Sequence, residues 1–132
     1  MREEDQHKAY QEYRDNIISW ALEIRGLEKS QRTVGLNASR AIVDLLSAYL
    51  HNKKLVDEGF QLNHRWFKSP NVSQKLPDFK NKDKLMQTMV SLENSCETLT
   101  YGAPKPSEKI KEVIALFNEA EKLIQVMLDE KA

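Results

Sequence analysis

The chain contains few of the residues that cross-link a protein or interrupt its helices. It has one cysteine, Cys96, in 132 residues, which excludes an intramolecular disulfide and a zinc site of paired cysteines. Glycine and proline number four each, so long segments run without a helix-breaking residue. No apolar run approaches the roughly 18 to 20 residues that a membrane-spanning helix needs. These absences favour a globular protein without disulfides or membrane spans.

The chain also lacks an excess of positive or negative charge. Twenty Lys and Arg residues balance twenty Asp and Glu residues, so the formal net charge is zero. Without an overall positive field, we expect no general attraction to DNA or to anionic lipids. Residues Met1–Lys8 are charged and no apolar stretch of the signal-peptide type follows them, so we expect a cytoplasmic protein. The length fits a single domain over residues 1–132.

The most regular feature of the sequence is helical periodicity. Apolar residues recur at spacings of three and four in four segments, which predicts four amphipathic helices. They cover about residues 5–28 and 30–54, a third begins at Asn81 or Asp83, and a fourth opens at Pro106–Glu108. No segment is typical of a β-strand. The expected fold class is therefore all-α, a four-helix up-and-down bundle with a long loop between helices 2 and 3.

That loop, residues 56–82, is the first candidate for function, because long loops in compact domains are functional or loosely ordered. Residues 52–84 contain eight Lys and Arg against four Asp and Glu, a net charge of +4. Aromatic residues and cations alternate in Phe60–Lys68, which includes Asn63, His64, Arg65, Trp66 and Lys68. Such residues suit a nucleotide or a single-stranded nucleic acid. Alternatively, the apolar members plug the open end of the bundle while the cations face water.

A polar stripe crosses the otherwise apolar second helix. Its members, at spacings of three and four, are Asn37, Arg40, Asp44, Ser47 and His51. In one interpretation Arg40 and His51 face a pocket with the loop, where arginine binds phosphate and histidine acts as general acid or base. Arg40 and Asp44 would then neutralise each other if partly buried. In the other interpretation the stripe is an ordinary solvated helix face.

Other chemistry finds little support in the sequence. The three histidines lack the spacing that places two metal ligands on one face, so we expect no metal site. Cys96 shares an apolar stripe with Met89 and Leu92, which is typical of a core residue and not of a nucleophile. No glycine-rich phosphate loop is present, and we expect no cofactor.

The order of the segments resembles the HEPN superfamily. The residues that carry this resemblance are Ser39–Leu50 in the second helix and the hinge Leu99–Gly102 before the last helix. The resemblance spans nearly the whole chain and implies a short helical bundle, often a homodimer. It implies an RNA-cleaving toxin, a partner of a minimal nucleotidyltransferase, or a noncatalytic module that binds RNA or nucleotides. Catalytic members carry an Arg and, shortly after it, a His near the last helix, but no Arg follows Arg65 and no His follows His64. The resemblance therefore transfers no catalytic residue.

Together these features favour a noncatalytic HEPN-like module that contacts a nucleotide, RNA or a partner protein of the nucleotidyltransferase type. The candidate ligand-binding residues are Arg40, His51, Asn63, His64, Arg65, Trp66 and Lys68. One alternative is a metal-independent ribonuclease of a toxin–antitoxin system, which would require His51 and His64 to reach one common phosphate position. The other alternative is a purely structural, dimeric scaffold.

Overall fold

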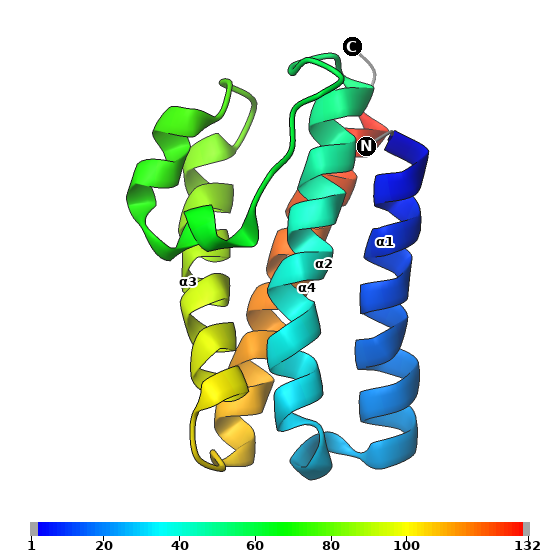
Figure 1. Cartoon of the computed structure of the whole chain (residues 1–132), viewed down its shortest axis with the longest axis vertical. Coiled ribbons are helices and arrows are strands. Elements are labelled where there is room, and N and C mark those ends of the chain that lie inside the picture. Colours follow the sequence, from blue (N-terminus) through cyan, green and yellow to red (C-terminus); the bar gives the residue numbers. More distant parts are fainter. Residues whose placement is uncertain (1–2, 131–132) are drawn as a thin grey trace.

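The computed structural model describes residues 3–130, without the side chains of Trp20 and Ile24, and in this range the fold is all-α (Figure 1). The four α-helices and the segments beside the first turn are α1 (Glu3–Asp15), the π-helical η1 (Asn16–Arg25), the 3-10 helix η2 (Leu27–Lys29), α2 (Gln31–Asn52), α3 (Lys82–Tyr101) and α4 (Ser107–Asp129). No described residue forms a strand. The prediction of an all-α protein is confirmed.

The first helical segment is less uniform than its periodicity predicts. Its α-helical turns change to π-helical turns at Asn16, and the chain leaves the helix at Gly26. Gly26 has a φ of 86°, a left-handed value that glycine adopts without steric cost. The segment therefore ends before the expected limit at residue 28.

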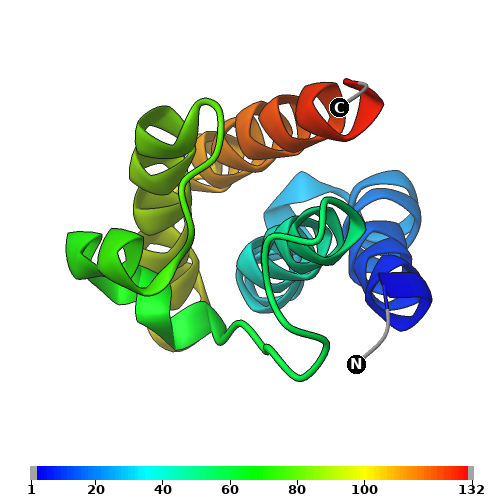
Figure 2. The same cartoon turned by 90° about the horizontal axis from the view of Figure 1, so that it is seen from above.

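The second helix, α2, lies at the centre of the packing. It contacts α1, α3 and α4, and Figure 2 shows it enclosed between them. Thirteen of its 22 residues are buried, which explains why it is apolar over most of its circumference between Ala41 and Leu50. Among residues 3–130, no helix is long and apolar enough to cross a membrane.

The connection between α2 and α3, residues 53–81, is folded onto the helices. It contains two 3-10 segments, η3 (His64–Lys68) and η4 (Pro70–Lys75). The side chain of Asn63 accepts a hydrogen bond from the backbone N–H of Arg65 and so caps η3. Phe67 and Val72 are each 1% exposed and belong to the same apolar core as the helices. The expectation that apolar residues of Phe60–Lys68 are buried against the helices is confirmed for Phe67.

Gly35 marks a close approach of α2 to α3. An added Cβ at Gly35 would lie 2.7 Å from Oγ1 of Thr100 and 2.9 Å from Cβ of Leu99. Helix propensity alone makes Gly35→Ala stabilising by about 1 kcal/mol. Because such contacts force α3 to move, and overpacking costs about 1–3 kcal/mol, we expect the variant to lose about 1 kcal/mol net in urea unfolding followed by circular dichroism.

The matched control for this substitution is Gly59→Ala in the connection. A Cβ at Gly59 meets no atom within 4 Å, so this variant should unfold at the same urea concentration as the parent protein or a higher one. A Gly35→Ala protein as stable as Gly59→Ala would show that α2 and α3 tolerate a wider separation.

Candidate functional site

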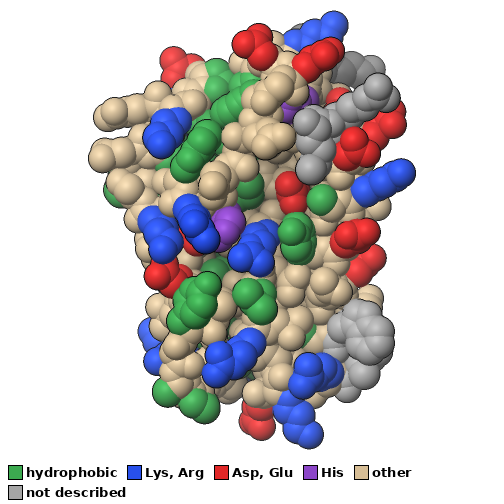
Figure 3. Space-filling model, viewed as in Figure 1, with side chains coloured by type: hydrophobic (Ala, Val, Ile, Leu, Met, Phe, Trp, Pro, Cys, Tyr) green, Lys and Arg blue, Asp and Glu red, His purple; other side chains and the backbone are tan. Residues whose placement is uncertain are grey.

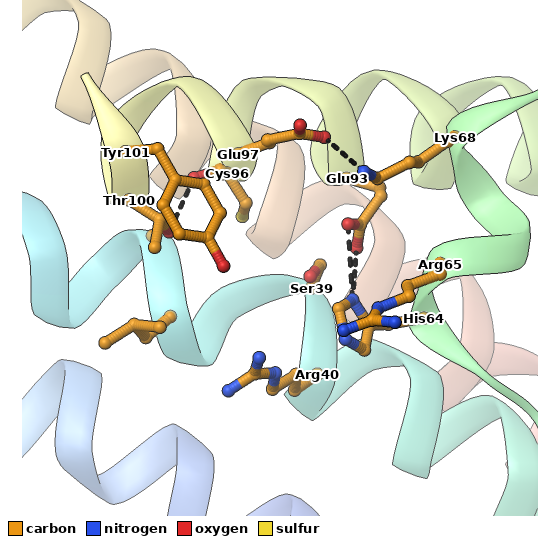
Figure 4. A pocket seen from close by; sticks show the side chains of 12 residues that line it. Ser39, Arg40, His64, Arg65, Lys68, Glu93, Cys96, Glu97, Thr100 and Tyr101 are labelled. Atoms are coloured by element: carbon orange, nitrogen blue, oxygen red, sulfur yellow. Dashed lines mark hydrogen bonds and ion pairs between the residues drawn. The ribbon is translucent and has the colours of Figure 1, made fainter.

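Two pockets meet where the connection crosses α2 and α3. Their volumes are about 220 Å³ and 410 Å³, and Arg40, His64 and Arg65 line both. Figure 4 shows the residues that line the first pocket. We call the two pockets together the basic groove. The first pocket extends towards Tyr101 at the end of α3, and the second extends towards Tyr13 on α1.

Arg40 and Arg65 supply the available positive charge of the groove. Arg40 comes from α2 and Arg65 from η3. Within the described residues, neither guanidinium is paired with a carboxylate, so the expected neutralisation of Arg40 by Asp44 is wrong. Figure 3 shows Lys and Arg side chains around a histidine on the face where the connection covers the helices. Unpaired guanidinium groups of this kind are suited to bind a phosphate.

His64 is held in place by a buried carboxylate. Its Nδ1 lies 3.1 Å and 3.2 Å from the two carboxylate oxygens of Glu93, whose side chain is 5% exposed. The Glu93 carboxylate would be costly to bury without a partner, and His64 is that partner. The contact therefore links η3 to α3. Because Nδ1 faces Glu93, the other ring nitrogen, Nε2, is the one left to meet a ligand.

Lys68 forms a second tie between η3 and α3. Its Nζ lies 3.0 Å from Oε2 of Glu97, one helical turn after Glu93. Both side chains of this pair are more than 40% exposed, so the pair contributes little to stability. Lys68 lines the first pocket, and its charge is shared with Glu97.

Asp44 brings a carboxyl group into the second pocket. The group is half-buried, and burial raises its pKa to about 6. Arg40, His64, Arg65, Tyr13 and Asn63 line the same pocket. Near pH 6 the Asp44 carboxyl therefore exists both as a hydrogen-bond donor and as an acceptor for a ligand in the groove.

Cys96 lies at the base of the first pocket. It is 2% exposed, and burial raises the pKa of its thiol to about 12, so the thiol is neutral at pH 7. A neutral, buried thiol is a poor nucleophile. The prediction that Cys96 is a core residue is confirmed.

Two exposed apolar side chains flank the mouth of the first pocket. Tyr101 is 80% exposed and Leu36 is 40% exposed. Only four large hydrophobic side chains are exposed among the residues with described side chains, and two of them lie at this pocket. An exposed aromatic ring beside arginines is the combination that a nucleobase and its phosphate require.

The structure brings five of the seven candidate binding residues to the basic groove and leaves two outside it. The five are Arg40, Asn63, His64, Arg65 and Lys68. Nε2 of His51 instead lies 3.1 Å from the carbonyl oxygen of Phe60, where it holds the start of the connection. The ring of Trp66 stacks on Phe60 at a centroid distance of 6.2 Å, with Lys75 above it. His64 lines both pockets of the groove, and His51 lines neither of them.

The polar stripe of α2 is more buried than a solvated helix face. Ser47 is 4% exposed, and Asn37 bonds to the carbonyl oxygen of Thr33 and to Asn16. Arg40 and Asp44 are partly buried at the groove. The stripe therefore serves several contacts, and only its central part reaches the candidate site.

Among the groove residues that were not identified as site residues from the sequence, Glu93 and Tyr101 matter most. Glu93 stands four residues after Met89 and three before Cys96, so a carboxylate at a core-facing position was the available signal. Tyr101 gave no comparable signal, because its exposure depends on where α3 ends.

Among residues 3–130, no group of three or more His, Cys, Asp or Glu side chains is placed to hold a metal ion. No family model, curated protein or solved structure matches this chain.

Proposed function

We propose that this protein is a cytoplasmic, noncatalytic module of the HEPN type that binds a phosphate group of RNA or of a nucleotide in the basic groove. The observation that carries the proposal is the position of Arg40 and Arg65. They reach the same two pockets from different elements, and no carboxylate among the described residues pairs with either. Arginine binds phosphate through two parallel N–H donors, and Tyr101 supplies a surface for a base.

A metal-independent ribonuclease is the second candidate, and the contact between His64 and Glu93 favours it. A carboxylate that holds one ring nitrogen orients the other for proton transfer. In such an enzyme His64 and Asp44 would exchange protons with the ribose 2′-hydroxyl and the leaving 5′-oxygen, while Arg40 and Arg65 stabilise the phosphate charge. This version of the site does not use His51.

Arg40→Gln and Arg65→Gln are each expected to weaken ligand binding roughly tenfold, because each removes charge-assisted hydrogen bonds to the phosphate. The measurement is fluorescence anisotropy with labelled AMP and with an unstructured RNA of about twelve nucleotides. The control is Lys111→Gln on the exposed side of α4, which removes the same charge outside the groove.

The same samples are checked for RNA cleavage on a gel. Binding without cleavage supports the noncatalytic module. Cleavage that is lost in His64→Ala and in Asp44→Asn supports the ribonuclease. If neither AMP nor RNA binds, both candidates fail and a protein partner becomes the better interpretation of this surface.

A further inference from the structure

A second group of cations lies outside the basic groove, at the N-terminal end of α2. Arg25, Lys29 and Arg32 line a separate pocket of about 360 Å³ that contains a single carboxylate, Glu28. The three cations come from the end of η1, from η2 and from the first turn of α2. We call this group the lower cation cluster. One phosphate bound in the basic groove would not contact this cluster, so its net positive charge points to a further part of the ligand.

The lower cation cluster is connected to the groove along one face of α2. Arg32, Leu36 and Arg40 follow at spacings of four, so they share that face and span roughly 12 Å of the helix axis. Nη1 of Arg32 donates a hydrogen bond of 2.8 Å to the carbonyl oxygen of Thr100, the neighbour of Tyr101. Figure 3 shows hydrophobic side chains between an upper and a lower group of Lys and Arg side chains on this face.

The order along this path is therefore cation, exposed aromatic ring, cation. A free nucleotide carries its phosphates at one end of the nucleoside, and two separated cation groups do not match that pattern. A single strand carries a phosphate and a base in every nucleotide, and this repeat matches two cation groups with an aromatic ring between them. The ring of Tyr101, with 80% of the residue exposed, is available to stack a base of any identity.

Building on the proposed function, on which this inference rests, we propose that the ligand is a single strand of nucleic acid and not a free nucleotide, with unstructured RNA as the probe. The strand places one phosphate between Arg40 and Arg65, stacks the adjacent base on Tyr101 beside Leu36, and continues to the lower cation cluster at Arg32. Recognition by stacking and by phosphate contacts makes the binding tolerant of sequence.

The first test uses the unaltered protein and varies the ligand. Anisotropy and competition titrations compare AMP, ATP and unstructured RNAs of about two, four, eight and twelve nucleotides. We expect affinity to rise with length, so that the longest RNA binds at least roughly tenfold more tightly than AMP and more tightly than ATP. The salt dependence should also steepen with length, because a longer strand releases more counterions.

The second test uses variants along the path. Tyr101→Ala should weaken binding of the longest RNA by roughly fivefold to a hundredfold, whereas Tyr101→Phe keeps the ring and the affinity. Arg32→Gln should reduce the slope of log K against log salt by about 0.7 for the longest RNA and leave AMP binding unchanged. Lys111→Gln is the charge-matched control, and thermal unfolding checks that each variant is folded.

The outcomes separate this inference from the proposed function. Equal affinities for AMP and every RNA, with Arg32→Gln and Tyr101→Ala without effect, overturn the strand and leave phosphate binding by Arg40 and Arg65 intact. If ATP binds more tightly than the longest RNA, the strand is also overturned, and phosphate binding by Arg40 and Arg65 still stands. Absence of binding to every ligand overturns both proposals.

Discussion

Phe67→Ala is expected to lower the free energy of unfolding by about 3–5 kcal/mol, the usual cost of emptying a fully buried aromatic site. Phe67 is 1% exposed and lies in η3, between Arg65 and Lys68. Its ring therefore anchors to the core the segment that supplies Arg65 and Lys68 to the groove. Urea unfolding followed by circular dichroism measures the stability loss, and RNA anisotropy at low temperature measures the binding loss that should accompany it.

Phe117→Ala is the control that separates lost stability from a lost site. Phe117 is also 1% exposed, but it lies in α4, which contributes no residue to the basic groove. We expect a similar loss of stability with nearly normal RNA affinity under conditions where both variants remain folded. If the Phe67→Ala protein bound RNA as tightly as the Phe117→Ala protein, the groove would not depend on the anchoring of η3.

Asp44→Asn is expected to stabilise the protein at pH 7 by about 1–2 kcal/mol. Burial raises the pKa of Asp44 in the folded state to about 6, above the ordinary value of 3.8. Between these values the folded protein keeps a proton that the unfolded chain releases, so stability falls as the pH rises from about 4 through 6. A shift of this size corresponds to nearly 3 kcal/mol by the usual conversion of about 1.4 kcal/mol per unit, reduced here because the group is only half-buried.

The measurement is urea unfolding of Asp44→Asn and the parent protein at pH 4 and pH 7. The difference between them should be small at pH 4 and reach its full size at pH 7. Asp57→Asn, which alters an exposed carboxylate of the connection, should change little at either pH. A stabilisation of Asp44→Asn that is the same at both pH values would contradict the assignment of the effect to the ionised carboxylate.

The all-α fold was predictable because a helix that buries one face carries apolar residues at spacings of three and four. The apolar run of α2 forms the centre of the core, and the stripes of α3 and α4 face it. The change from α-helix to π-helix at Asn16 left no such pattern, since the two helix types share similar residue preferences. The location of the candidate site was also predictable, because the basic and aromatic connection supplies two of its three Lys and Arg residues, Arg65 and Lys68.

The composition of the site was predictable only in part. His51 and Arg40 belong to one polar stripe, yet only Arg40 reaches the groove, because the connection covers His51 before it turns towards α3. Which histidine meets Arg40 depends on that path, and local spacing carries no information about it. Trp66 illustrates the same limit, since its sequence neighbours suit stacking on a base whereas its ring stacks on Phe60. The homodimer and the nucleotidyltransferase-type partner stay predictions.

The long connection between α2 and α3 also has a consequence for the order of folding. The helix pairs on either side of it are joined by short turns, so the contacts beside those turns link near neighbours in the chain. The contact between His64 and Glu93 closes a separation of 29 residues, which costs more chain entropy than a turn does. The contact between Arg14 and Glu121, which joins α1 to α4, spans 107 residues. The basic groove is therefore expected to form after the local turns, in the stage of folding that also brings the two helix pairs together.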